Sequence, residues 1–142
     1  MSGDLPQRVK QFYELVNVDR AKALEQLPLL YAADVQFVNP VADQTGLQRF
    51  IETWKGAFKL YTLFEFENVR VMGTEEAFAL TYVMKLKFSF GPVFPSEMAT
   101  YCLSRDGKVF YCRDYFDPLG SLVTPFPPFN WLYRFIFSRL VA

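Results

Sequence analysis

The stretch FALTYVMKLKFSF, residues 78–90, decides the fold class, because almost every second residue from Phe78 to Phe90 is large and apolar. This period of two is typical of a β-strand with one buried face. Similar alternation follows at residues 98–103 and 108–116, and Asp106-Gly107 between them is a strong signal for a tight hairpin.

Residues 64–71 also alternate, but the phase changes after Glu67, which predicts a β-bulge near Asn68. Upstream, helical spacing of apolar residues predicts three helices, around residues 9–16, 19–27 and 47–58, and a short strand at 35–38. Helices and strands are segregated, so the class is α+β. We expect a cone-like curved sheet, mixed or antiparallel, wrapped around three N-terminal helices. Residues 1–142 form a single domain, with 118–142 as a C-terminal extension that ends in an aromatic tail helix.

Composition excludes several kinds of site. The chain has 142 residues, no histidine and a formal net charge of +0. Without histidine there is no Ser-His-Asp triad and no His-ligated metal, and the balanced charge does not indicate a nucleic-acid partner. We expect no cofactor and no metal. Two cysteines and a polar start without a signal peptide favour a cytoplasmic location.

Three stretches carry a family resemblance. LYAADVQFVNPV, residues 30–41, followed by Gly46 and the third helix, resembles ketosteroid isomerase and its SnoaL-like relatives, as does EAFALT, residues 76–81. RDYFD, residues 113–117, resembles the last strand of limonene epoxide hydrolase. Both enzymes share the nuclear transport factor 2-like fold. The resemblance covers about residues 5–118 and implies an apolar cavity for a steroid, terpenoid or polyketide-class molecule.

The ketosteroid isomerase resemblance does not extend to the catalytic residues. Asn39 stands where that family has its catalytic base, and an amide cannot take a proton at neutral pH. The oxyanion-hole Tyr falls at Phe12, beside Tyr13, and the oxyanion-hole Asp falls at Ala99. Because losing even one oxyanion donor is costly, we expect that the protein is not a standard ketosteroid isomerase.

The epoxide hydrolase resemblance preserves more of a site. Asn39 and Asp114 match two of the water-holding residues, while Phe37 replaces the Tyr. On the third strand of that family an Arg and an Asp complete the site, and here Val83 and Lys85 stand in their places. The resemblance therefore implies an incomplete hydrolase site.

Hairpin register then predicts which residues accompany Asp114. A two-residue turn at Asp106-Gly107 pairs Ala99 with Asp114, Tyr101 with Cys112 and Cys102 with Tyr111, which puts the two cysteines on opposite faces. One face would then carry, besides Asp114, the following residues: Tyr101, Ala99, Cys112 and Phe116. We expect this face to line the cavity, and desolvation among aromatic side chains to raise the pKa of Asp114.

Further candidate ligand contacts come from the third strand of the sheet and from the helices. Tyr82 and Met84 point inward if the cavity wall is apolar, whereas a one-residue slip would turn Val83 and Lys85 inward instead. We favour the first register, which leaves Lys85 in solvent or at an interface. The remaining candidate ligand-binding residues, from helices and first strand, are Phe37, Phe12 and Trp54.

The sequence thus predicts a protein that binds a hydrophobic small molecule. If it is an enzyme, Asp114 is the acid or base, Asn39 orients the ligand, and the chemistry is cofactor-independent isomerisation or epoxide and water addition. The alternative is a non-catalytic ligand-binding or scaffold module of the same fold.

Two apolar surfaces indicate partners. The outer sheet face would carry Tyr111, Tyr115 and Cys102, which predicts a homodimer through that face. The tail at residues 129–140 is strongly aromatic and holds two arginines. We favour packing of this tail on the domain or on a second subunit; contact with a membrane surface is the alternative.

Overall fold

The computed structural model describes residues 3–141, and within them five helices and six strands form. In chain order these are α1 (Leu5–Val16), α2 (Arg20–Leu30), β1 (Tyr31–Asn39), β2 (Ala42–Thr45), α3 (Leu47–Leu60), β3 (Leu63–Gly73), β4 (Ala77–Lys87), β5 (Phe94–Arg105), β6 (Lys108–Tyr115), α4 (Pro118–Val123) and α5 (Pro127–Val141). Strand β2, which pairs with β1, was not expected from the sequence.

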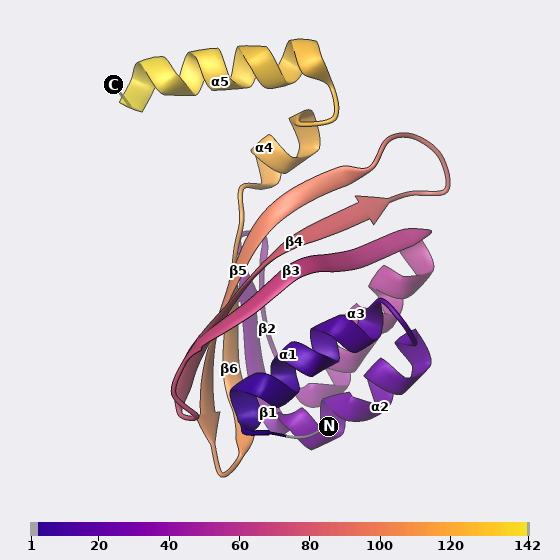
Figure 1. The fold of residues 1–142 in the computed structure, drawn as a ribbon, viewed down its shortest axis with the longest axis vertical. Coiled ribbons are helices and arrows are strands. Elements are labelled where there is room, and N and C mark those ends of the chain that lie inside the picture. Colours follow the sequence, from indigo (N-terminus) through magenta and orange to yellow (C-terminus); the bar gives the residue numbers. More distant parts are fainter. Residues whose placement is uncertain (1–2, 142) are drawn as a thin grey trace.

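The strands form one curved sheet in the order β2-β1-β6-β5-β4-β3. Only the β1–β6 pair is parallel, so the sheet is mixed. Figure 1 shows the sheet curling around α1, α2 and α3, which lie in its concave side. The α+β cone predicted from the sequence is confirmed.

Side-chain caps and a bulge hold the helices against the sheet. Asp4 caps α1 and Asp19 caps α2 by accepting backbone N–H bonds. At the end of α1, the Asn17 side chain makes two hydrogen bonds to the Phe66 backbone, of 2.7 and 2.9 Å. The pairing of β3 with β4 shifts between Glu67 and Arg70, and Asn68 has a φ of 55°. The predicted bulge is confirmed, and it helps β3 bend over α1.

The hairpin between β5 and β6 has the predicted turn but not the predicted register. Asp106 and Gly107 have φ values of 55° and 75°, as a two-residue hairpin turn requires. However, Ser104 pairs with Val109 and Leu103 with Tyr111, so Phe110 is an extra residue in β6. Side chains alternate between the two faces of a sheet. One extra residue in β6 therefore changes, for every residue after it, which residues of β5 lie on the same face.

The expected pairing of Ala99 with Asp114 is therefore wrong, and Thr100 lies opposite Asp114 instead. Cys102 pairs with Cys112, so the two thiols share the inner face, where both are buried and free. Tyr101 lies on the outer face and is 39% exposed. That face keeps Tyr115, at 52% exposure, and loses Cys102. A homodimer through it stays a prediction.

The C-terminal extension leaves the sheet, although α4 stays in contact with β5 through a 2.7 Å hydrogen bond between the Ser96 and Ser121 hydroxyls. After Tyr115 the chain forms the short helix α4 and then α5, which stands away from the sheet at the open end of the cone (Figure 1). No residue of α4 or α5 is buried. Among residues 3–141, no helix is long and apolar enough to cross a membrane.

Candidate functional site

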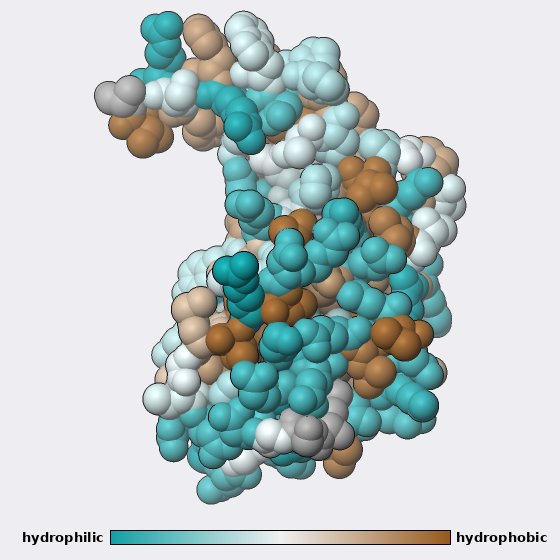
Figure 2. All heavy atoms as spheres, in the orientation of Figure 1, coloured by the Kyte–Doolittle hydropathy of each residue, from teal (hydrophilic) through white to brown (hydrophobic). Residues whose placement is uncertain are grey.

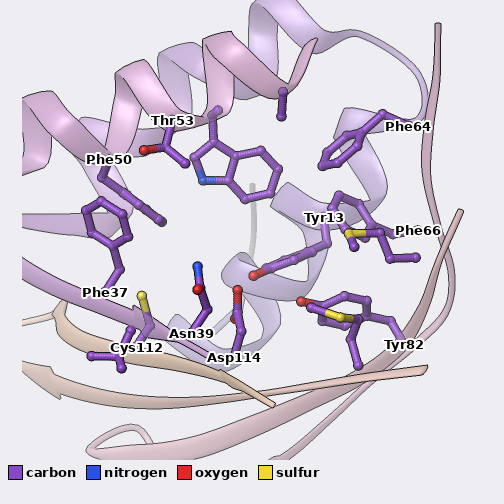
Figure 3. A pocket seen from close by; sticks show the side chains of 15 residues that line it. Tyr13, Phe37, Asn39, Phe50, Thr53, Phe64, Phe66, Tyr82, Cys112 and Asp114 are labelled. Atoms are coloured by element: carbon purple, nitrogen blue, oxygen red, sulfur yellow. The ribbon is translucent and has the colours of Figure 1, made fainter. Parts of the chain in front are cut away.

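A cavity of about 130 Å³ lies between α1, α3 and the concave face of the sheet (Figure 3). Aromatic and other apolar side chains form most of its wall, with a few polar groups. Its lining residues are Tyr13, Phe37, Val38, Asn39, Phe50, Thr53, Trp54, Ala57, Phe64, Phe66, Tyr82, Met84, Met98, Cys112 and Asp114.

Trp54 on α3 organises the aromatic wall. The ring lies 5.0 Å from Phe12 and 5.9 Å from Tyr13, Phe64 and Phe66, mostly in edge-to-face geometry. Such pairs stabilise beyond the area that they bury. Helix α3 brings Trp54 here because its apolar residues recur every three to four positions. One side of the cavity is therefore a continuous aromatic wall.

Polar groups meet at one end of the cavity. The Tyr82 hydroxyl lies 2.8 Å from Thr100 Oγ1, and Thr100 Oγ1 donates to Asp114 Oδ1 at 2.7 Å. Tyr82 also hydrogen-bonds Tyr13. Figure 3 shows the oxygens of Tyr13, Tyr82 and Asp114 turned toward one another. Helix α1 and strands β4, β5 and β6 each supply one member of this chain of four groups, Tyr13, Tyr82, Thr100 and Asp114.

The order of the protons in this chain follows from donor counting. A threonine hydroxyl has a single hydrogen. Because Thr100 donates it to Asp114, Thr100 must accept from Tyr82. Tyr82 has then used its own hydrogen and must accept from Tyr13. All three hydroxyl hydrogens point along the chain toward Asp114, so the carboxylate is the end of the chain and its second oxygen is the acceptor left for a ligand.

Burial makes the Asp114 carboxyl group, at the end of this chain, less acidic. It raises the pKa of Asp114 from 3.8 to about 6, and the hydrogen bond from Thr100 lowers it only in part. Burial also raises the pKa of Tyr82, and the charge of Asp114 raises it further. Among residues 3–141, no Lys or Arg forms an ion pair with Asp114. A carboxylate with a pKa near neutrality in an apolar cavity can accept and return a proton.

Asn39, the other polar residue predicted from the sequence, lies beside Asp114 in the cavity wall (Figure 3). Strands β1 and β6 are parallel here, and the pairing of Phe37 with Cys112 brings the next inward pair, Asn39 and Asp114, alongside each other. Asn39 Oδ1 accepts a 2.9 Å bond from the Val41 backbone and so stabilises the turn. Its amide nitrogen is then the group available to donate to a ligand.

Other sequence-predicted ligand contacts fall into two groups. Five of them line the cavity: Phe37, Trp54, Tyr82, Met84 and Cys112. Three do not. Phe12 is completely buried in the core behind the wall, and Ala99 and Tyr101 lie on the outer face of the sheet because the bulge at Phe110 reverses the alternation. Phe116 lines a neighbouring hollow instead.

Sequence reasoning missed two members of the polar chain, Tyr13 and Thr100. Tyr13 was visible as the neighbour of Phe12, and only the rotation of α1 decides which of the two rings faces the cavity. Thr100 needed the bulge, because in the unbulged register it lies on the outer face. Lys85 forms an ion pair with Glu67 at 2.9 Å, and both side chains are partly exposed.

A second hollow of about 190 Å³ adjoins the cavity, and Met84 lines both. It lies under α4 and is almost entirely apolar, with Phe88, Phe94, Phe116 and Leu122 in its wall. A molecule longer than the first cavity would extend past Met84 into this hollow.

The two buried thiols do not resemble nucleophiles. Burial raises the pKa of both Cys102 and Cys112, and the Asp114 charge raises each further. Within residues 3–141, no three Cys, Asp or Glu side chains gather in a way that could hold a metal ion. The groups available for chemistry at this site are Asp114, Asn39 and the hydroxyl chain.

Comparison with known protein families places the fold and this site in context. The SnoaL-like domain family matches residues 9–111, from within α1 to within β6, and the match ends before Asp114. The chain belongs to the SnoaL-like domain family. It is thereby a member of the nuclear transport factor 2-like superfamily, as the sequence resemblance implied. A comparison with curated protein sequences gave no match.

Solved structures share the fold at low sequence identity. A proposed polyketide cyclase from Pseudomonas putida has a TM-score of 0.69 at 16% identity, with 82% of this chain and 94% of that chain covered. An NTF2-like protein of unknown function from Burkholderia pseudomallei has a TM-score of 0.72 at 13% identity, covering 87% and 97%. A protein with a ketosteroid isomerase-like fold from Catenulispora acidiphila, in complex with trimethylamine, has a TM-score of 0.63 at 21% identity, covering 83% and 91%.

Proposed function

We propose that the cavity binds a small, mainly apolar molecule and that Asp114 takes a proton from it or from a water beside it. One observation carries this proposal: a carboxylate that has no cationic partner in the described residues accepts a hydrogen bond from Thr100, which is itself bonded to Tyr82, inside an aromatic cavity. A buried charge without such a role is costly to keep. The reaction class is cofactor-independent isomerisation or water addition.

The volume of the cavity limits the size of the ligand. An engineered protein cavity of about 150 Å³ accommodates benzene, whereas drug-sized ligands occupy roughly 300 Å³ or more. At about 130 Å³, the first cavity fits a single ring or a short branched chain. Four fused rings would not fit it, and a longer terpenoid or polyketide fragment would need the hollow beyond Met84.

For an unsaturated ketone the proton transfers balance as follows. Asp114 removes a proton from the carbon between the carbonyl and the double bond, and the electron pair moves onto the carbonyl oxygen. The Asn39 amide donates a hydrogen bond to that oxygen. Asp114 then returns the proton to the far end of the former double bond, which gives the conjugated ketone. In this scheme Tyr82 holds Asp114 through Thr100 and does not touch the substrate.

A direct test uses 3-cyclohexenone, a one-ring ketone that absorbs more strongly once conjugated. We expect conversion by the full chain, with kcat/KM rising as pH increases through about 6, because the base must be ionised. Asp114→Asn should abolish conversion, whereas the exposed Asp43→Asn should not change it. Unchanged activity in Asp114→Asn would overturn the assignment of the base.

Binding can be followed separately with the Trp131→Phe variant, which leaves Trp54 in the cavity wall as the single tryptophan. A one-ring ketone should change its fluorescence. A steroid should not. If no one-ring ketone or alkene perturbs Trp54, the cavity is not a binding site for this class.

A second candidate function is non-catalytic binding of a small tertiary or quaternary ammonium ion. It is favoured by the same aromatic wall with one carboxylate, since aromatic faces and an anion together attract such cations, and a structural relative was solved in complex with trimethylamine. Tetramethylammonium separates the two functions. If it quenches Trp54 in the Trp131→Phe chain but not when Asp114→Asn is added to that chain, and no ketone is converted, the protein is a binding module.

A further inference from the structure

Helix α5 exposes a large amount of apolar surface. None of its residues from Pro127 to Val141 is buried. Phe129 is 61% exposed, Trp131 66% and Leu140 74%. Its visible attachments are local: it packs on α4, and the Tyr133 hydroxyl donates to Asp117. Apolar patches of this size on a single element mark a surface that another phase or molecule covers.

The polar residues of α5 form one narrow stripe. Asn130, Arg134 and Ser138 are spaced four residues apart and so share a face. Most of the remaining circumference is aromatic or aliphatic, apart from Arg139 near the end. A helix with a broad apolar face, aromatic residues and arginines is typical of helices that lie in the membrane interface. At 15 residues it is too short to span a bilayer.

A second element at the same end of the cone is also apolar and exposed. The β4–β5 loop carries Phe88, Phe90 and Val93 at 38%, 82% and 38% exposure. This loop reaches the start of α5, because Phe126 lines the same hollow as Phe88 and Phe90. Figure 1 shows the loop, α4 and α5 together at the open end, opposite the β5–β6 turn. The apolar loop and the apolar helix therefore lie at the same end of the molecule.

The charge of α5 and the β4–β5 loop indicates which kind of surface they would bind. Residues 118–142 contain two arginines and no acidic residue, and residues 86–96 contain only Lys87 as a charged residue. Since the whole chain is neutral, with fifteen basic and fifteen acidic residues, residues 1–117 carry an excess of two negative charges. Arg134 shares a hollow with Glu97 and Asp117, and the two arginines together would attract this end of the molecule to an anionic surface.

A docking site on a second copy is less well matched. Apart from Tyr101 and Tyr115 on the outer sheet face, the large exposed apolar side chains of the cone are far apart in the chain, for example Val18, Leu29, Val41 and Met72. In Figure 2 the hydrophobic patches on the visible face of the cone are separated by hydrophilic ones. A helix of 15 residues is about 22 Å long, and these scattered side chains do not form an apolar groove of that length.

We propose that α5 and the β4–β5 loop lie together on an anionic lipid surface, with Arg134 and Arg139 at the level of the headgroups and the aromatic residues below them. The proposal is independent of the ligand in the cavity, because none of the residues on which it rests lines the first cavity.

Intrinsic fluorescence provides the test. In Trp54→Phe, Trp131 is the single tryptophan and reports on α5 alone. On addition of vesicles of phosphatidylcholine with phosphatidylserine we expect a blue shift of its emission and co-sedimentation of the chain. Vesicles of phosphatidylcholine alone, or high salt, should give much weaker binding.

Two matched variants sharpen the result. Arg134→Gln with Arg139→Gln should weaken binding to the anionic vesicles roughly 30-fold, from about fivefold for each arginine near such a surface. Arg49→Gln with Lys55→Gln removes the same charge from the exposed side of α3 and should leave binding unchanged. If both pairs of substitutions weaken vesicle binding equally, the loss reflects net charge alone, and the placement of α5 on the lipid surface is wrong.

The other possible occupant gives a different result. Leu132→Ser with Ile136→Ser should abolish vesicle binding without altering the mass of the chain in solution. If Trp131 emission is already blue-shifted without lipid, and this pair converts a dimer to a monomer, a second copy covers α5 and the lipid proposal is wrong. An unshifted Trp131 in the presence of anionic vesicles would also overturn it.

Discussion

The two tryptophans of this chain lie in opposite environments although both belong to helices that contain several aromatic residues. Trp54 is 9% exposed, with rings from α1, α3 and β3 around it. Trp131 is 66% exposed, and its ring partner is Phe135, one turn away on the same helix, at 5.4 Å. The cone closes over its aromatic residues because segments far apart in sequence meet there. Aromatic composition therefore predicts apolar surface, but tertiary partners decide whether that surface is covered.

The largest expected difference between the two tryptophans is in the stability that is lost when each ring is removed. Trp54→Ala should lower the free energy of unfolding by about 3–5 kcal/mol, as expected for a large buried side chain. Trp131→Ala should change it by less than about 0.5 kcal/mol, as for other exposed positions. Urea denaturation of the two variants at one pH gives both values. A cost above about 1 kcal/mol for Trp131→Ala would show that α5 is already packed against protein in solution.

A medium effect is expected from Asp114→Asn, and its sign depends on pH. Because burial raises the pKa of Asp114 from 3.8 to about 6, the folded state holds its proton more tightly than the unfolded state. The wild type therefore loses stability as pH rises from about 4 to 6, and the Asn variant has no such loss. At pH 8 we expect Asp114→Asn to be more stable by about 1–3 kcal/mol, and below pH 4 this advantage should vanish.

The exposed Asp43→Asn is the control for this pH series, since its side chain bonds only Gln36 at the surface. Its stability curve should run parallel to that of the wild type between pH 4 and 8. If Asp114→Asn also runs parallel, the carboxylate has an ordinary acidity in the folded protein and is not a poised base.

Much of the fold could be predicted from the sequence because its signals are local. Alternation at residues 78–90, the Asp106-Gly107 turn and the phase change at Asn68 each depend on neighbouring residues, and the structure confirms a strand, a turn and a bulge there, although the strand ends at Lys87 and not at Phe90. The inward placement of Tyr82 and Met84 followed from the same alternation. Asp114 and Asn39 were found from family resemblance, and the structure places both in the cavity wall.

The rest of the site could not be predicted because it depends on one residue. Phe110 is bulged out of the ladder, and no turn residue or phase change in β6 announces it. That bulge moves Thr100 inward and Ala99 and Tyr101 outward, so the hydrogen-bonded chain to Asp114 was invisible. Likewise, only the rotation of α1 against β3 and β4 decides that Tyr13 and not Phe12 reaches the cavity.

The smallest expected difference in stability is between removing two tyrosine hydroxyls, one in the cone and one in the C-terminal extension. Tyr82→Phe removes the hydrogen donated to Thr100 and the acceptor used by Tyr13, both in the buried chain. It should cost about 1 kcal/mol of stability, the net worth of a buried hydrogen bond. Tyr133→Phe removes an exposed hydroxyl that donates to Asp117, and we expect no measurable loss of stability. Chemical denaturation of both variants checks this difference.

The pH profile of Tyr82→Phe then tests the direction of the hydroxyl chain. If the chain runs from Tyr13 through Tyr82 and Thr100 to Asp114, Thr100 still has its own hydrogen to donate to the carboxylate after the substitution. The titration of Asp114 should therefore stay near pH 6 while any turnover of a one-ring ketone slows only modestly. Thr100→Val removes the donor that touches Asp114 and should shift the titration upward, because that hydrogen bond lowers the pKa. A larger upward shift in Tyr82→Phe than in Thr100→Val would mean that Tyr82, and not Thr100, holds the carboxylate in its ionised form.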